Sequence, residues 1–318
     1  MDSAVSAPVL VLGGAGFIGR HVCRALLAAG LHPIIGSRFG PHQDRRLDQD
    51  LARLPRRSIR FDAHLHAAAW RPWLDQVGLV INVVGILRQR GSETYRKVHT
   101  DAPGALAEAC AATSLPLIHL SGLGLRHDAQ SRFNLSKLAG ESAIQASGVR
   151  GYIVRAPLLD GPDGYGARWL RRVANWPIQF IPARTAALAP MAVGDLAQIL
   201  ATMARELLHA APACRIVELS GARSMSLAHY LDVLRDPARK APLVRLQVPA
   251  ALARLAAHVF DLAHLTPYSF GHHELLQHPN LSAADESERW LGRPARTLHP
   301  SPGEGAPGAA TASVPVRW

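Results

Sequence analysis

The sequence predicts an α/β protein with a doubly wound parallel sheet and a smaller, mostly helical C-terminal lobe, and three observations support this. Short apolar runs alternate with helical patterns through the first half of the chain, as expected when helices connect parallel strands. With 318 residues, of which 48% are hydrophobic, the chain can bury one sizeable core. After residue 155 the alternation gives way to segments rich in proline and glycine, and then to helical patterns.

The strands and helices are predicted in order along the chain. Apolar runs of strand length cover residues 8–12, 33–36, 58–61, 79–84, 115–120 and 151–154. Between them, apolar residues recur at helical spacing over residues 17–29, 94–112 and 136–146. We then expect a strand near 187–192, a helix at 195–208 and a strand at 215–219, so that the chain returns to the sheet. Residues 246–291 are predicted to be mostly helical, and residues 300–318 to be a disordered tail.

Composition narrows the class of protein. Cys23, Cys110 and Cys214 lie far apart in apolar segments, which is typical of reduced, buried thiols and of a cytoplasmic protein. The N-terminus lacks the basic and apolar regions of a signal peptide, and the best candidate for a membrane span, residues 246–265, contains Arg254 and Asp261.

The net charge indicates the kind of partner. A formal charge of +11 favours anionic partners such as nucleotide phosphates or an acidic membrane surface, where a peripheral contact is conceivable. No basic stretch with the pattern of a nucleic-acid module accompanies this charge, so we expect no nucleic-acid binding.

The strongest motif is the glycine-rich run at residues 13–19, which follows the first strand and opens the first helix. Glycines permit a tight turn and close approach of a pyrophosphate, and the helix N-terminus donates N–H groups to anionic oxygens. A Rossmann-type dinucleotide site is therefore predicted, rather than a merely structural turn. Its expected binding residues here are Gly13, Gly16, Phe17, Ile18 and Gly19.

The end of the second strand indicates which nicotinamide cofactor fits. An acidic residue at this place binds the ribose 2′-hydroxyl of NAD, whereas arginine accommodates the 2′-phosphate of NADP. The sequence has Ser37 and Arg38 here, without a carboxylate, which favours NADP(H) over NAD(H). The alternative is that Arg38 is only solvated.

The spacing of these glycines resembles that of the extended short-chain dehydrogenases and reductases, a superfamily that includes the NAD-dependent epimerases and dehydratases. This resemblance implies that Asp62 contacts the adenine and that Asn82, Val83 and Gly85 pass beneath the cofactor. It also implies that Ser121 orients a substrate carbonyl, although Ser121 could instead bond only to backbone. Lys137 matches the lysine of the family's Tyr-x-x-x-Lys pair and would hold the nicotinamide ribose.

The chain departs from that pair, because Phe133 stands four residues before Lys137, where the family has its tyrosine. Without the phenol the usual proton donor is missing, a loss that typically costs a factor of about 100 to 10,000 in rate. Tyr165 is a conceivable substitute, with packing or surface exposure as the alternative.

A narrower resemblance covers most of residues 8–295. The runs 81–86, 95–110, 131–141, 193–197 and 267–276 are similar to an atypical group that contains the NADPH-binding accessory subunit of respiratory complex I. This resemblance implies a structural cofactor and a respiratory-complex type of protein partner.

Two functions follow. One is an accessory or assembly protein with bound NADP(H), and the other is an active oxidoreductase or epimerase-type enzyme on an unknown small-molecule substrate, using Ser121, Lys137 and another acid.

The remaining motifs have plain alternatives. The histidines at 64, 66, 272, 273 and 278 lack carboxylate or cysteine partners at ligand spacing, so no metal site is predicted. The basic aromatic stretch at 168–176 could hold an anion or touch a membrane, with a packed helix as the alternative. Asp195 is predicted to cap a helix, with structural support of the substrate side as the alternative. We expect a dinucleotide-binding domain at 1–160, to which the chain returns within 185–222. A smaller lobe is expected at 161–184 and 223–298, and a tail at 299–318.

Overall fold

The computed structural model describes residues 7–38, 47–236, 244–263 and 268–298. At its centre lies a seven-stranded parallel sheet in the order β10-β6-β5-β4-β1-β2-β3. Its strands are β1 (Val9–Leu12), β2 (Pro33–Ser37), β3 (Arg56–Ser58), β4 (Leu79–Asn82), β5 (Leu117–Gly122), β6 (Gly151–Ala156) and β10 (Arg215–Glu218). The strand order reverses between β1 and β4, and the carboxyl ends of the strands at such a point form a crevice where ligands bind.

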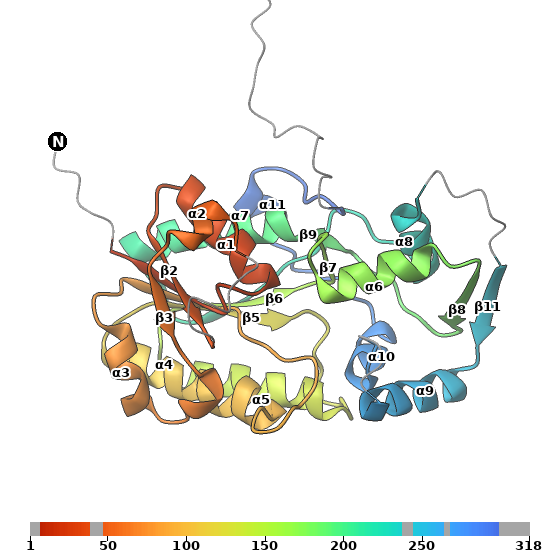
Figure 1. Cartoon of the computed structure of the whole chain (residues 1–318), viewed down its shortest axis with the longest axis horizontal. Coiled ribbons are helices and arrows are strands. Elements are labelled where there is room, and N and C mark those ends of the chain that lie inside the picture. Colours follow the sequence, from red (N-terminus) through yellow and green to blue (C-terminus); the bar gives the residue numbers. More distant parts are fainter. Residues whose placement is uncertain (1–6, 39–46, 237–243, 264–267, 299–318) are drawn as a thin grey trace, which may run out of the picture.

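Helices cover both faces of this sheet (Figure 1). One face carries α1 (Phe17–Ala28), α7 (Val193–His209) and α11 (Ser287–Leu291). The other carries α3 (Ala67–Leu74), the π-helical turn η2 (Arg96–Asp101), α4 (Ala102–Ala112) and α5 (Arg132–Ala146), and the short α2 (Gln49–Ala52) and η1 (Phe61–Ala63) lie near β3. Strand β1 shows why both faces are covered, because Val9 and Val11 belong to one core cluster and Leu10 and Leu12 to the other.

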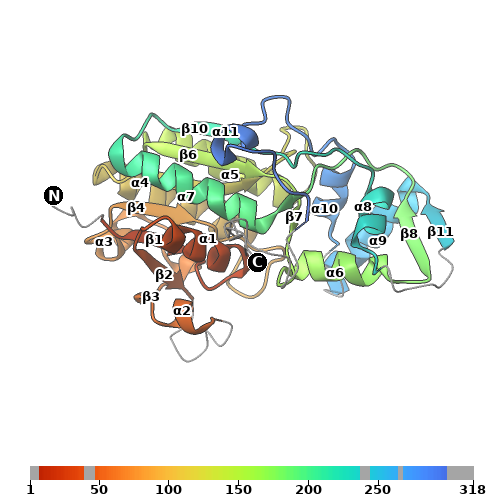
Figure 2. The ribbon, with the colours of Figure 1, turned by 90° about the horizontal axis from the view of Figure 1, so that it is seen from above.

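The smaller lobe lies at the opposite end of the molecule from β3 (Figures 1 and 2). It contains α6 (Tyr165–Ala174), β8 (Ile178–Pro182), α8 (Leu227–Leu234), β11 (Val244–Val248), α9 (Ala250–Ala263) and α10 (Phe270–Leu276). β8 and β11 form a separate two-stranded parallel sheet, as do β7 (Leu159–Asp160) and β9 (Met191–Ala192). A third core cluster, which includes Tyr230 and Leu231, joins α6, β8 and α8.

The predicted fold class is confirmed, including the return of the chain to the sheet, which β10 makes by pairing with β6. The third strand lies earlier than predicted, at Arg56–Ser58, because residues 61–63 form a 3₁₀ turn. The strand expected near 187–192 is reduced to β9 and lies outside the main sheet. The predicted tail lies outside the described residues, and the domain boundaries stay a prediction.

Two further predictions concern single residues. Asp195 does not cap α7, because it is the third residue of that helix, and its buried carboxylate instead accepts hydrogen bonds from Arg293 and Arg296. Cys23 and Cys110 are buried and unbridged as predicted, whereas Cys214 is unbridged but only partly buried. Burial raises the pKa of the Cys23 and Cys110 thiols to about 12.

Candidate active site

The glycine loop, residues 13–16, connects β1 to α1 at the crevice. Gly13 has a φ of +81°, which side-chain-bearing residues rarely adopt. A Cβ at Gly19 would lie 2.2 Å from the carbonyl oxygen of Gly13, so α1 can pack on the loop only because this position has no side chain. The first turn of α1 contains no acidic residue, and its N-terminus can therefore attract an anion.

A cavity of about 1280 Å³ begins at this loop and extends into the smaller lobe. Its sheet end brings together most of the predicted site residues, namely Gly13, Gly16, Phe17, Ile18, Gly19, Ser37, Arg38, Val83, Gly85, Ser121, Phe133 and Lys137. A pocket for one small ligand usually measures about 300–1,000 Å³. The cavity therefore has room for a dinucleotide and for part of a second large molecule.

Asp62 and Asn82 are placed differently from the other predicted residues, since neither lines the cavity. Asp62 is buried and accepts a hydrogen bond from Ser92 Oγ at 2.9 Å, while its neighbour Phe61 forms the cavity wall. Asn82 is fully buried, and its Oδ1 accepts a hydrogen bond from the Val84 N–H at 3.0 Å. Asn82 thus holds the turn that presents Val83 and Gly85 to the cavity.

The end of β2 carries an ion pair at the cavity wall. Arg38 is half exposed and pairs through Nη1 with Glu93, and both side chains line the cavity. The alternative that Arg38 is only solvated is therefore wrong.

Ser121 and Lys137 both line the cavity and come from different elements. Ser121 lies near the end of β5, and its buried Oγ has no hydrogen-bond partner within the part of the chain that the structure describes. Lys137 lies on α5, where burial lowers the pKa of its ammonium group and the Glu141 carboxylate partly opposes this effect. A buried hydroxyl without a partner is costly, which suggests that Ser121 Oγ bonds to a ligand.

The ring of Phe133 occupies an aromatic enclosure beside Lys137. Its centroid lies 5.7 Å from Lys137 Nζ, and the rings of Tyr95, His99 and His272 surround it at 5.4–5.6 Å between centroids. The register from which the missing tyrosine was inferred thus places Phe133 next to Lys137.

Sequence reasoning missed two protonatable side chains of the cavity. Tyr268 and His272 both line it, although the histidine was considered only as a metal ligand. His272 Nδ1 lies 2.6 Å from Ser269 Oγ, and burial lowers the pKa of its imidazole to about 4, so the ring is neutral at pH 7. Tyr268 Oη lies 2.6 Å from Nδ1 of His273. Tyr165, the predicted substitute, lines the cavity but is 51% exposed.

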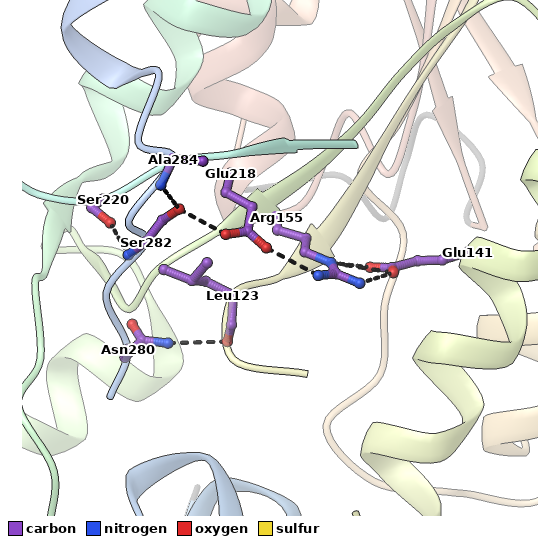
Figure 3. Close-up of polar contacts among 8 residues, drawn as sticks. All are labelled: Leu123, Glu141, Arg155, Glu218, Ser220, Asn280, Ser282 and Ala284. Carbon is purple, nitrogen blue, oxygen red and sulfur yellow. Dashed lines mark hydrogen bonds and ion pairs between the residues drawn. The ribbon is translucent and has the colours of Figure 1, made fainter. Parts of the chain in front are cut away.

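A polar network beneath the cavity holds α5 against the sheet (Figure 3). Arg155 of β6 donates to Glu141 of α5 at 2.7 Å and to Glu218 of β10 at 3.0 Å. Glu141 follows Lys137 by one helical turn. The network therefore fixes the helix position that brings Lys137 to the cavity.

Asn280, from the C-terminal part of the chain, forms hydrogen bonds near this network (Figure 3). Its Nδ2 donates to the carbonyl oxygen of Leu123 at 3.0 Å, and its Oδ1 accepts from the N–H of Leu158 at 3.1 Å. Asn280 also lines the cavity. It joins the loops after β5 and β6 across more than a hundred residues of chain.

Two of the histidines that were considered as metal ligands are engaged in packing and hydrogen bonds. His64 contacts Trp70 and Trp73, and His273 lies 3.0 Å from Gln277 Nε2. Within residues 7–38, 47–236, 244–263 and 268–298, no group of three or more His, Cys, Asp or Glu side chains could hold a metal ion. No helix in these ranges is long and apolar enough to cross a membrane.

Comparison with known proteins places the chain in a family. Residues 9–213 match the NAD dependent epimerase/dehydratase family. The chain belongs to this family. It is also 29% identical, over 253 residues, to the ceramide reductase of Caulobacter vibrioides, a match that covers 77% of this chain and 75% of that protein.

Solved structures of other proteins share the fold. The NADPH-dependent quinone oxidoreductase of Escherichia coli, complexed with NADPH, has a TM-score of 0.69 at 15% identity and covers 91% of this chain and 96% of its own. MoeE5 in complex with UDP-glucuronic acid and NAD has a TM-score of 0.62 at 17% identity, with coverages of 91% and 94%. A UDP-galactose 4-epimerase also has a TM-score of 0.62, at 14% identity and with the same coverages. Proteins that bind different molecules therefore share this fold.

Proposed function

We propose that this chain is an NADP(H)-dependent reductase of a long-chain lipid that carries a ketone. The observation that carries the proposal is the composition of the cavity, which continues from the glycine loop into an apolar chamber. The chamber is lined by Leu123, Leu158, Leu170, Val173, Phe180, Leu188, Leu227, Leu231, Ala253, Ala256, Phe260, Leu275 and Leu276. Such a wall suits alkyl chains, whereas a sugar nucleotide would lose the hydrogen bonds of its hydroxyl and phosphate groups there. The ceramide reductase of Caulobacter vibrioides agrees with this substrate class.

The dinucleotide fits the glycine loop and would supply a hydride to the carbonyl carbon. Ser121 Oγ, buried and without a partner in the described structure, donates a hydrogen bond to the carbonyl oxygen. Lys137 then gives this oxygen a proton as negative charge develops on it, and its lowered pKa makes it a stronger acid than an exposed lysine. The reaction thus proceeds without the missing phenol at Phe133.

Arg38 gives the preference for NADP(H), because its guanidinium can bind the 2′-phosphate. Arg38→Ala is expected to weaken NADPH binding by about tenfold to a hundredfold, the range for hydrogen bonds to a charged group, and to leave NADH binding nearly unchanged. The dissociation constants of both cofactors test this. Glu93→Gln is the matched control, since it removes the competing carboxylate and should tighten NADPH binding. Equal weakening of NADPH and NADH by Arg38→Ala would contradict the assignment.

A second function is favoured by Phe133 itself. In an accessory protein the bound NADP(H) stabilises the fold, and a partner of the respiratory-complex type uses the surface. The phenylalanine side chain cannot donate a proton, and its enclosure by three aromatic rings is compatible with a site that performs no redox turnover.

Turnover as a function of chain length separates these functions. We expect NADPH oxidation with a ceramide whose backbone alcohol is oxidised to a ketone, and a KM that falls as the acyl chain lengthens. A UDP-sugar should give no reaction. Oxidation that is independent of chain length would contradict the apolar chamber as the substrate site, and no oxidation with any ketone would favour the accessory function.

A further inference from the structure

Seven large apolar side chains are exposed together at the end of the smaller lobe. They lie on β8, β11 and α9, which are neighbours at one end of the molecule (Figures 1 and 2). Each is between 45% and 60% exposed. This apolar face consists of Ile178, Phe180, Val244, Leu246, Leu252, Leu255 and Val259. Contiguous exposed apolar patches on a folded protein commonly mark an interaction surface.

The two-stranded sheet makes the apolar face continuous with the cavity. In its parallel register Ile178 pairs with Val244 and Phe180 with Leu246, and alternation along each strand places these four side chains on one side of the sheet. The next pair on that side is Pro182 with Val248. Phe180, Pro182 and Val248 line the cavity, so the apolar surface runs from the outside into the substrate chamber.

Helix α9 repeats this arrangement. Leu252, Leu255 and Val259 are three and four residues apart and therefore share one side of the helix. Ala256 and Phe260, on the adjoining side, line the cavity. The polar side of the helix carries Arg254, whose guanidinium lies 5.5 Å from the ring centroid of Phe270. An apolar side of this width, with arginine opposite, is typical of helices that lie in a membrane interface.

Most charged residues around the apolar face are arginines. Residues 165–184 and 244–263, which provide this face and its surroundings, contain six arginines and one acidic residue, Asp261. Arg171 is paired with Asp160 and Arg245 with Asp232, whereas Arg168, Arg172, Arg184 and Arg254 are exposed. Exposed arginines next to inserted apolar side chains are attracted by anionic lipid headgroups.

We propose that the apolar face docks onto an anionic lipid bilayer and that the cavity takes its lipid substrate directly from the membrane. The uptake of substrate rests on the proposed function, whereas docking does not. A second copy of the chain fits this surface less well. A twofold contact would set the apolar face of one copy against that of the other, and would bring the positively charged arginines of the two copies close together. Such a contact would also cover the cavity at Phe180.

Flotation of the full chain with vesicles tests the docking. We expect binding to vesicles of phosphatidylcholine and phosphatidylglycerol, weaker binding to phosphatidylcholine alone, and a loss of binding at high salt. The double variant Leu252→Ser/Leu255→Ser should weaken binding by about a hundredfold, because two leucines no longer enter the apolar layer. Neither leucine lines the cavity, so turnover of a detergent-dispersed ketone should be unchanged.

Leu27→Ser is the matched control, since Leu27 is an exposed leucine of α1, far from this lobe, and it should bind vesicles as the parent chain does. Equal binding by the double variant and the parent would overturn the proposal, as would a concentration-dependent dimer that the double variant abolishes. No vesicle binding together with lipid turnover in detergent would overturn docking alone. Vesicle binding without turnover would overturn the proposed function alone.

Discussion

Gly19→Ala is expected to weaken dinucleotide binding by about a hundredfold or more. The new methyl group would lie 2.2 Å from the carbonyl oxygen of Gly13 and 2.6 Å from the Cα of Gly14. Both neighbours are backbone atoms, so the loop itself must move away from α1. Movement of the loop removes N–H groups from the phosphates, and two lost charge-assisted hydrogen bonds account for a factor of this size. Fluorescence titration with NADPH measures the effect.

Gly166→Ala is the control for this variant. Gly166 lies on α6 at the cavity wall, outside the glycine loop, and a Cβ there meets no atom within 4 Å. Its NADPH affinity should equal that of the parent, and its stability to urea should not fall, because alanine favours a helix. Parent-like affinity of Gly19→Ala would show that the loop does not hold the cofactor.

Lys137→Met is expected to lower kcat by about 100-fold to 10,000-fold, the usual effect of losing a general acid. Methionine keeps much of the volume and apolar character of the lysine stem but has no proton to give. NADPH should still bind, although more weakly if the ammonium holds the ribose. Lys97→Met, which alters a lysine outside the cavity, should have parent-like kcat. A parent-like kcat for Lys137→Met would assign the proton to another group.

If Lys137 is the proton donor, the activity should change with pH in one direction. Lys137 acts in its protonated form, and burial lowers the pKa of its side chain below the ordinary lysine value of about 10.4. Activity should therefore be high at low pH and fall as pH rises through this lowered pKa. His272 has a pKa of about 4, so it is already neutral at the pH values where Lys137 loses its proton. It therefore does not cause the fall in activity. Lys137→Arg should retain no such decline, because arginine stays protonated.

The parts that sequence predicted well are those specified by neighbouring residues. The glycine run is contiguous with its strand and helix, so the places of Gly13 and Gly19 between β1 and α1 could be predicted from the local sequence alone. The alternation of buried strands likewise predicted the sheet, and the return of β10 to it. Phe133 was recognised because its distance from Lys137 along the helix is fixed.

The parts that it missed depend on contacts between distant segments. Tyr268 and His272 line the cavity from α10 and the residues just before it, more than 130 residues beyond Lys137, and no local pattern specifies that approach. The pairing of β8 with β11 spans more than 60 residues, and between them the chain returns to the main sheet through β10. Asp195 was predicted to cap a helix on local grounds, while its true partners, Arg293 and Arg296, follow about a hundred residues later. In each case the position of the residue or strand depends on tertiary contacts that the local sequence does not specify.

Transfer of a deuterium label tests the central claim most directly. The protein is mixed with NADPH that carries deuterium on the transferred position of the nicotinamide, together with a long-chain ketoceramide, and the lipid is analysed by mass spectrometry. We predict a ceramide alcohol that carries one deuterium, and a corresponding amount of NADP⁺. Recovery of the ketone unlabelled, with NADPH still bound and unoxidised, would contradict a reductase and would assign the dinucleotide a structural role.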